Sequence, residues 1–197
     1  MKILILSMLF FVSVKSIAQT PINIVNICNG LTSEDVSDNT YFKDINQTFD
    51  NYIGTWVWTS GNEIVTFKLT KVTQKYFPEE RVFEDYMIGN YSYSTDGGTT
   101  FIVNTITTPT NEERELNPMY TACVNDDDVG INIFAFDDVI IDKGNSYCTA
   151  TFEFLPNSTT QMQVTIENPK GPVGRLDGQP PFNPNFTIPT NMIVTKQ

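Results

Sequence analysis

The chain of 197 residues has 23 acidic and 12 basic side chains and a net charge of −11. A surface of this charge repels phosphate backbones and argues against nucleic acid as a partner. Its 40% of hydrophobic residues excludes a disordered chain, its length suits one domain with a sizeable core, and its lack of histidine removes Ser-His-Asp and Cys-His catalytic arrangements.

The first 18 residues have the pattern of a secretory signal. Met1-Lys2 precede an apolar run at residues 3–14, and Ser16-Ile17-Ala18 supply small residues for cleavage. The run is shorter than the ~20 apolar residues of a membrane span, and no later segment is apolar enough to cross a bilayer. We therefore expect export to the periplasm or beyond the cell, with a mature protein that begins at Gln19. Residues 19–38 would form an N-terminal extension and residues 39–197 a single β-rich domain.

One helix is predicted, over residues 39–53. Tyr41, Ile45, Phe49 and Ile53 recur at four-residue spacing, which places their side chains on one helical face. Asp38 is expected to cap the N-terminus of this helix, and Gly54 to end it in the left-handed conformation. A one-sided helix must pack against another element.

The rest of the chain is predicted to form strands joined by turns. Apolar and polar residues alternate at 65–70 and 162–167, which is typical of antiparallel strands packed on one core. Further strands are expected at residues 55–59, 82–93, 99–107, 119–124, 130–137, 147–155 and 191–196. Their short connections predict a meander that closes or folds over to protect its edges. The fold class is therefore all-β: a mostly antiparallel β-barrel or closely related sandwich, with one N-terminal helix.

Two connections have distinctive sequences. Residues 168–189 are rich in proline, which cannot donate to a sheet, so they predict a long loop. Phe182 and Phe186 would anchor it, either as a rigid surface loop or as a lid across a barrel mouth. The segment Ser94-Thr95-Asp96-Gly97-Gly98-Thr99-Thr100-Phe101 resembles the Asp-box hairpin of sialidase-like propellers. Because it occurs once, it predicts only a tight hairpin whose Asp side chain bonds the turn backbone.

Three cysteines in an exported protein suggest one disulfide and one free thiol. Cys123 and Cys148 each border a strand-like segment, and we predict that they pair with each other rather than with Cys28. The alternative is three reduced thiols in the core.

The sequence offers no catalytic residues, metal site or cofactor motif. Asn125-Asp126-Asp127-Asp128 carries clustered oxygen ligands, but Gly130 occupies a position where the helix-loop-helix calcium pattern needs Asp or Asn. We interpret this stretch as a solvated acidic loop. Carboxylates could still act in pairs on glycosides, although no pair stands out among so many acidic residues.

A short motif opens the first predicted strand. Gly54-Thr55-Trp56 follows the predicted helix and resembles the G-x-W signature of lipocalins and related calycin barrels. The resemblance implies structural roles for Gly54 and Trp56, with the Trp packed across the base of a barrel whose cavity holds a small apolar ligand.

A wider resemblance extends over most of the chain. Its motifs are Tyr41-Phe42-Lys43-Asp44-Ile45-Asn46, Tyr52-Ile53-Gly54-Thr55-Trp56, Ile88-Gly89-Asn90-Tyr91 and Met192-Ile193-Val194-Thr195-Lys196-Gln197. Together they resemble a family of exported Bacteroidetes proteins, the domain of unknown function numbered 6705. This resemblance implies export and a single domain, and it supplies no activity.

Three functional hypotheses follow. The leading one is a non-enzymatic binding module that holds a small apolar ligand in its barrel, because barrel mouths are a usual place for a pocket. Its expected lining residues are Trp58, Tyr86, Tyr91 and Tyr93. The second is a structural or interaction protein with a filled core, since side chains can fill a barrel of eight strands. The third is a carboxylate-based hydrolase.

Overall fold

The computed structural model describes residues 21–24, 31, 33–106, 112–124, 131–143, 148–169, 178 and 181–197. The predicted signal at residues 1–18, the acidic stretch at residues 125–128 and Cys28 lie outside these described residues. The expected start of the mature protein at Gln19 therefore stays a prediction.

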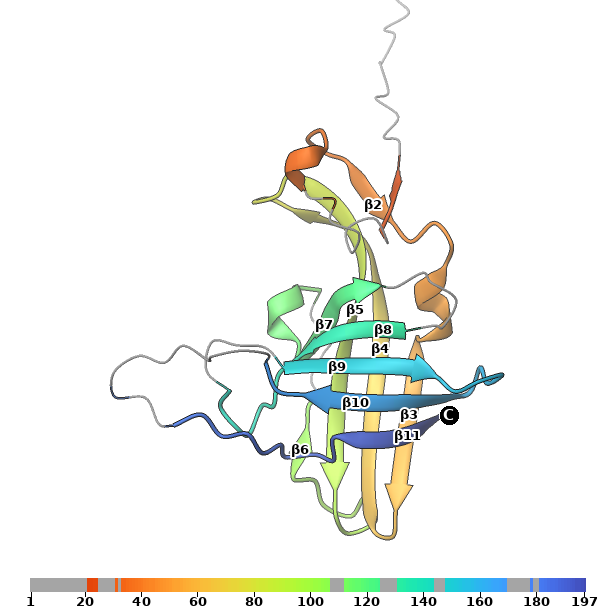
Figure 1. Ribbon diagram of the computed structural model, residues 1–197, viewed down its shortest axis with the longest axis vertical. Coiled ribbons are helices and arrows are strands. Elements are labelled where there is room, and N and C mark those ends of the chain that lie inside the picture. Colours follow the sequence, from red (N-terminus) through yellow and green to blue (C-terminus); the bar gives the residue numbers. More distant parts are fainter. Residues whose placement is uncertain are drawn as a thin grey trace, which may run out of the picture.

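The described strands form an all-β fold around a closed barrel (Figure 1), which confirms the predicted fold class. The barrel strands are β3 (Gly54–Ser60), β4 (Glu63–Phe77), β5 (Val82–Ser94), β7 (Met119–Val124), β8 (Ile131–Phe136), β9 (Cys148–Phe154), β10 (Gln161–Glu167) and β11 (Asn191–Lys196). Each pairs antiparallel with the next barrel strand along the chain, and β11 pairs with β3 to close the ring. In Figure 1, β8 to β11 run across the front of the long strands β3 to β5.

Gly89 marks the place where β5 changes partner. Its backbone pairs with Leu69 of β4 on one side and with Met119 of β7 on the other. A Cβ added at Gly89 would lie 2.9 Å from Leu69 Cδ2 and 3.1 Å from Met119 Cβ, so both neighbouring side chains would have to shift to admit one. Glycine therefore permits the close approach of β5 and β7 that completes the barrel.

Shorter elements complete the fold. The long strands β4 and β5 extend beyond the barrel at its upper end, where β2 (Tyr41–Lys43) pairs parallel with β5 and β1 (Ile22–Asn23) pairs parallel with β2 (Figure 1). Strand β6 (Val103–Asn104) pairs with the other end of β5. Three 3₁₀ turns are η1 (Ser33–Asp35), η2 (Thr48–Asn51) and η3 (Arg114–Leu116).

The helix predicted over residues 39–53 is wrong, because strand β2 and turn η2 occupy this segment. Asn39 and Gln47 have positive φ angles of 64° and 56°, which interrupt a right-handed helix. The four apolar residues of the predicted helical face are not buried together either, since Ile45 is 48% exposed.

Two buried carboxylates hold this segment in its observed form. Asp44 accepts hydrogen bonds from the backbone N–H groups of Thr48 and Phe49 and pairs with Lys71 at 2.8 Å. Asp85 accepts hydrogen bonds from the Tyr41 hydroxyl at 2.6 Å and the Asp44 N–H at 2.9 Å. Hydrogen bonds from backbone N–H groups to these carboxylates thus take the place of the backbone hydrogen bonds that a helix would form.

The barrel interior holds a continuous set of aromatic rings. The Phe152 ring lies 5.3 Å from Phe67 and 5.1 Å from Phe134, and the Tyr91 ring lies 5.3 Å from Phe136, measured between centroids. The largest interior side chains are fully buried: Trp56, Phe67, Tyr91, Phe134, Phe136 and Phe152. These distances fall in the range of favourable ring pairs, so the described interior is packed by the chain's own side chains.

Lys143 anchors the described end of the proline-rich segment. Its side chain is buried, and its ammonium donates to the Asn168 side chain at 3.1 Å, to the Asn183 carbonyl at 2.9 Å and to the Asn185 carbonyl. The same ammonium lies 3.9 Å from the centre of the Phe186 ring. Burial lowers the pKa of Lys143. Residues 181–187 are therefore tied to the barrel by a buried cation, and Phe186 serves as the predicted aromatic anchor.

Candidate functional site

A pocket of about 190 Å³ lies on the outer wall of the barrel. Strand β5, the segment before β7 and the loop after β8 meet there. The pocket is lined by Asn90, Thr105, Leu116, Asn117, Pro118, Asp137 and Val139.

Strand β5 supplies the floor of this pocket. Tyr91 belongs to the main core, whereas Tyr86 and Ile88 form a second apolar cluster, so even-numbered residues of this stretch face outward. Asn90 belongs to the outward set, yet the residue is only 8% exposed, and Asn117 and Pro118 before β7 line the same pocket. A polar residue is thus buried on what would otherwise be a solvent face.

The Asn90 carboxamide has no hydrogen-bond partner among the described residues. Solvent in the pocket reaches its polar atoms, because the buried side-chain atom without a partner among the described residues is Arg114 Nε. The amide of this mostly buried residue lines the pocket without a protein partner and is therefore available to a ligand.

Asp137 contributes the one carboxylate among the lining residues. Partial burial raises its pKa, and the negative charges of Asp138 and Asp142 add to that effect. No Lys or Arg of the described chain forms an ion pair with Asp137. The Asp137 N–H donates to the Pro118 carbonyl at 2.7 Å, which ties two walls of the pocket together.

The remaining polar groups of the lining hold the walls in place. The Thr105 hydroxyl accepts from the Tyr91 N–H at 2.9 Å and donates to the Tyr91 carbonyl at 3.0 Å. The Asn117 amide donates to the Glu113 carbonyl at 2.8 Å. Beneath the pocket, the Tyr91 hydroxyl accepts from the Val139 N–H at 3.1 Å and donates to the Asp137 carbonyl at 3.3 Å. Asn90 and Asp137 are therefore the lining groups left to act on a ligand.

Turn η3 forms one wall, and Arg114 clamps it to the barrel. The guanidinium carbon lies 4.3 Å from the Phe77 ring centre, 4.9 Å from Tyr86 and 5.9 Å from Tyr120. Arg114 also forms an ion pair with Glu84. Stacking on aromatic faces and pairing with a carboxylate are contacts that a guanidinium makes well. The clamp fixes the position of the following residues, Leu116 to Pro118.

The rim of the pocket is apolar and open to solvent. Leu116 is 68% exposed and Val139 is 43% exposed. Single exposed apolar side chains are ordinary, but two of them border a pocket that has polar groups in its lining. The pocket thus combines a carboxylate, an unpaired amide and two aliphatic walls.

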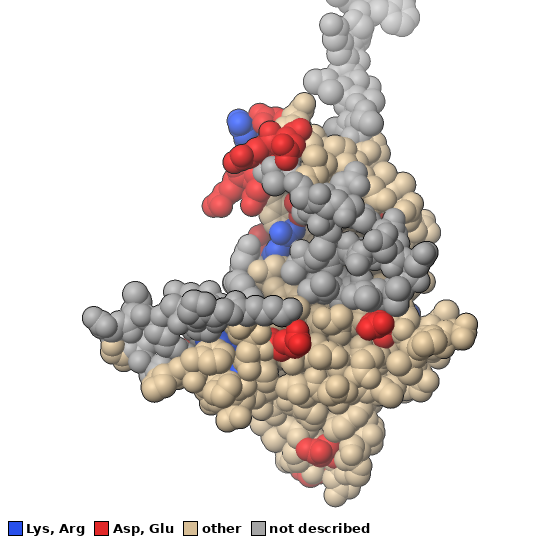
Figure 2. Space-filling model, viewed as in Figure 1, with Lys and Arg blue, Asp and Glu red and all other residues tan. Residues whose placement is uncertain are grey.

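A second hollow lies at the upper end of the molecule. Figure 2 shows acidic side chains gathered there, and the hollow is lined by Glu34, Asp38, Glu79, Glu80 and Arg81. Arg81 pairs with Asp38 at 3.2 Å, and both side chains are well exposed. This hollow has no apolar wall, so it resembles a solvated charged surface rather than a binding pocket.

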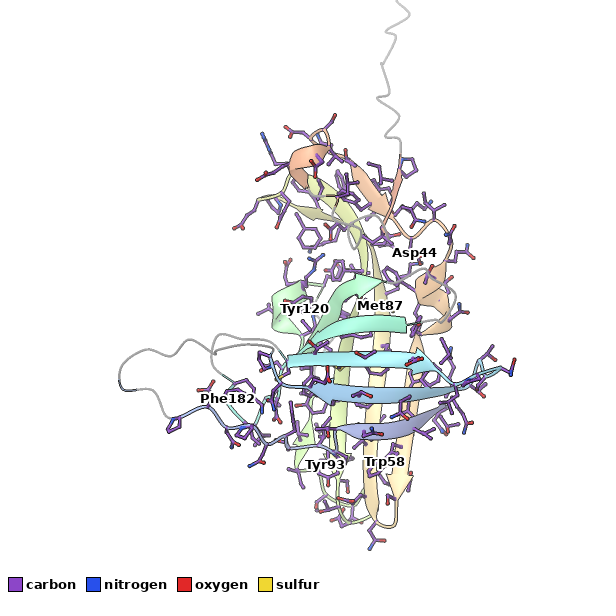
Figure 3. The ribbon with its side chains drawn as sticks, viewed as in Figure 1. Asp44, Trp58, Met87, Tyr93, Tyr120 and Phe182 are labelled. Atoms are coloured by element: carbon purple, nitrogen blue, oxygen red, sulfur yellow. The ribbon has the colours of Figure 1, made fainter. Side chains whose placement is uncertain are left out.

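The four aromatic residues expected to line one cavity lie in different places. Trp58 and Tyr93 lie together at the lower end of the barrel (Figure 3), because both register with Val65 of β4. Tyr91 is fully buried in the layer of Trp56, since both register with Phe67. Tyr86 faces outward and contacts Arg114. The structure therefore brings together only Trp58 and Tyr93.

Trp56 and Gly54 occupy positions that fit the structural roles expected of them. The Trp56 indole N–H donates to the Tyr52 carbonyl at 2.7 Å, and its ring lies 5.9 Å from the Phe154 ring. Gly54 has φ of 128° at the start of β3, a conformation that side chains disfavour. Trp56 follows turn η2 closely in the sequence and bonds the Tyr52 carbonyl at the end of that turn. It therefore connects the turn to the barrel.

The predicted disulfide between Cys123 and Cys148 is not formed in the structure, where Cys148 is a buried free thiol. The reason is strand order, because β8 lies between the strands that carry the two cysteines. Cys123 registers with Ile133 of β8, and Cys148 registers with Phe136 farther along the same strand. Sequence spacing alone did not show that a third strand would separate them.

Sequence reasoning missed Asn90 and Asp137. The available signal was a polar residue within the apolar run from Met87 to Tyr91, which is unusual for a buried strand. Within the described residues, no cluster of three His, Cys, Asp or Glu side chains is arranged to hold a metal ion. No helix in the described part of the chain is long and apolar enough to cross a membrane.

Comparisons with known proteins identify a family. No curated protein and no solved structure matches the chain. A family model described as "Family of unknown function (DUF6705)" matches residues 1–197. The chain therefore belongs to the DUF6705 family.

Proposed function

We propose that this protein is an exported, non-enzymatic binding module whose ligand occupies the outer-wall pocket, while the barrel serves as its scaffold. The observation that carries the proposal is the carboxamide of Asn90, a mostly buried residue, which lines the pocket and has no partner among the described residues. Solvent reaches this amide, so a ligand can replace water as its hydrogen-bond partner. Export is proposed from the signal pattern at residues 1–18.

Packing of the interior supports a site outside the barrel. Fully buried rings at about 5 Å from one another occupy the described interior, as expected for an eight-stranded barrel that side chains fill. The outer-wall pocket of about 190 Å³ is smaller than the ~300 Å³ at which drug-sized pockets begin. The ligand is accordingly a small molecule or a single side chain, rather than a lipid or a large apolar compound.

The lining favours binding over hydrolysis. Glycoside hydrolysis uses two carboxyl groups on opposite sides of the bond, and the pocket is lined by one, Asp137. The buried carboxylates Asp44 and Asp85 are occupied by backbone, hydroxyl and ammonium donors. They stabilise the segment around β2 and η2.

A second candidate function is an interaction protein with a filled core and no ligand. The ring packing in the barrel favours it as much as it favours the first proposal. The two candidates differ in what the outer-wall pocket does, so ligand binding at Asn90 separates them.

Chemical-shift mapping with small probes tests the proposal. The exported protein, labelled with ¹⁵N, would be titrated separately with n-butylamine hydrochloride, n-butanol, sodium butyrate and methyl α-glucoside. We expect at least one probe to cause saturable shifts at Asn90 and Asn117, and the Asn90→Leu variant to lose them.

The matched control is Asn191→Leu, which removes an exposed amide on β11. It should bind like the parent protein. If neither these four probes nor Nα-acetyl-lysine methylamide shifts the pocket resonances, the binding function is contradicted and the interaction protein is the better account.

A further inference from the structure

We infer that the outer-wall pocket selects a ligand that carries a primary ammonium group on a short alkyl chain. This inference rests on the proposed function, because it names the chemical class that the same pocket takes. It follows from the charge of Asp137, the unpaired amide of Asn90 and the aliphatic walls of Leu116 and Val139.

The charge of the pocket comes from carboxylates without an opposing cation in the lining. Asp137 lines the pocket, whereas Asp138 lies behind it and is buried. The Asp138 carboxylate accepts from the N–H groups of Ile140, Ile141 and Thr187, and from the Thr187 hydroxyl at 2.7 Å. Asp138 is thus held in place and does not compete for a ligand, and its charge acts both on Asp137 and on the buried Lys143.

The lining contains no Lys or Arg, so an incoming cation meets no repulsion there. Asp137 is exposed, so a cation can reach its carboxylate directly from solvent.

The hydrogen-bonding groups fit an ammonium. An alkylammonium has three donors and no acceptor. The Asp137 carboxylate and the Asn90 side-chain oxygen are acceptors that no described residue occupies. A neutral alcohol would satisfy one of them without balancing the charge, and a carboxylate ligand would be repelled by Asp137.

The walls fit a short alkyl chain. Leu116, Pro118 and Val139 line the pocket next to the polar groups, and its volume of about 190 Å³ suits a chain of a few carbons. An alkyl chain that removes these side chains from water gains the free energy of apolar burial. The acidic hollow at the upper end has no such wall, which is why we assign the site to the outer-wall pocket.

The test compares one carboxylate in the pocket with one in the acidic hollow. Asp137→Asn removes the pocket charge while keeping its shape, and Glu80→Gln removes one charge from the upper hollow. Binding of n-butylamine hydrochloride and n-butanol would be followed by chemical shifts at Asn90 and Asn117, at pH 7 and constant ionic strength. Nα-acetyl-lysine methylamide would be a third arm, because a lysine side chain of another protein carries the same group.

We expect at least one of the two amines to bind at least about tenfold more tightly than n-butanol. Asp137→Asn should remove that preference, and Glu80→Gln should leave it unchanged. If the lysine derivative alone binds, the ammonium group that the pocket recognises belongs to a side chain of another protein. If butylamine binds, the ligand is a free amine.

Four results would overturn the inference. Equal affinity for n-butanol and both amines would remove the charge preference, although the binding function would stand. Binding of butyrate or methyl α-glucoside without binding of either amine would also contradict the preference for an ammonium group and leave the binding function standing. Loss of amine binding in Glu80→Gln but not in Asp137→Asn would place the site in the acidic hollow. If no probe binds at all, the proposed function fails together with its ligand class.

Discussion

Trp56 illustrates how a single side chain joins two elements of this fold. Its indole donates to the Tyr52 carbonyl, and its fully buried ring packs against Phe154. Trp56→Ala should lower the free energy of unfolding by about 3–5 kcal/mol, as deletion of a core aromatic does. Urea denaturation measures this loss. Trp58→Ala is the control, because Trp58 is only partly buried and should cost less. Equal losses for the two variants would contradict this placement.

Burial also controls the chemistry of Cys148. It raises the pKa of the Cys148 thiol to about 11. At pH 8 such a thiol is almost entirely protonated, whereas an ordinary thiol of pKa ~8.5 is partly thiolate, the form that reacts. Iodoacetamide should therefore leave Cys148 unmodified in the folded protein and modify it in urea, as peptide mapping would show. Recovery of Cys148 in a disulfide with Cys123 would overturn this prediction.

Side-chain hydrogen bonds hold the turn after β5 in place. Asp96 accepts from the Thr100 N–H at 2.8 Å, the Thr100 hydroxyl at 2.6 Å and the Ser94 hydroxyl at 2.8 Å. The predicted hairpin, in which an Asp side chain bonds the turn backbone, is confirmed. Strand β6 is much shorter than the predicted strand at residues 99–107, because these side-chain bonds hold residues before Val103 in a turn.

These bonds make the hairpin sensitive to acid. Donation by Thr100 and Ser94 lowers the pKa of Asp96 to about 2. Because the folded pKa lies below the ordinary value of ~3.9, the contribution of Asp96 is complete above pH ~4 and is lost as the pH falls towards 2. An NMR titration of the Asp96 carboxyl carbon should have its midpoint near 2, and Thr100→Val should raise that midpoint. A midpoint near 4 in the parent protein would show that the bonds are absent in solution.

Turn η3 depends on Arg114 for its position beside the pocket. Arg114→Met keeps an apolar stem over Phe77 and Tyr86 but removes the charge that pairs with Glu84. We expect a loss of stability of about 2 kcal/mol, since the pair is partly exposed and the ring contacts contribute part of the effect. The substitution should also change the chemical shifts of Asn117, because turn η3 positions this residue. The control Arg81→Met removes a well-exposed pair with Asp38 and should change stability by less than about 1 kcal/mol. Similar losses in both variants would refute the clamp.

The strands could be predicted from sequence much better than the segment before them. Alternation of apolar and polar residues located β10 almost to the residue, because each strand has one face on a shared core. Residues 39–53 misled the same reasoning, since Tyr41, Ile45, Phe49 and Ile53 match helical spacing by chance. Pairing of Tyr41 with Phe83 and the buried carboxylates of Asp44 and Asp85 decide that segment, and these contacts are distant in sequence.

At the scale of the whole molecule, the meander predicted from short connections closes as a barrel by the pairing of β11 with β3. The candidate site could not be predicted in the same way. Asn90 lies on β5 and Asp137 follows β8, and both line one pocket with the segment before β7, whose Pro118 carbonyl accepts from the Asp137 N–H. Sequence patterns report which residues face a core, but not which loops cover the opposite face.

The central claim is that side chains fill the barrel, so that any ligand binds outside it. Xenon is a small apolar probe that enters dry apolar cavities. NMR under xenon pressure would follow the methyl groups of Val164 and Val194, which are fully buried in the core, and of exposed Leu116. We predict that the shifts of Val164 and Val194 stay as small and linear as those of Leu116. Saturable shifts at Val164 or Val194 would reveal a hollow barrel and contradict the account.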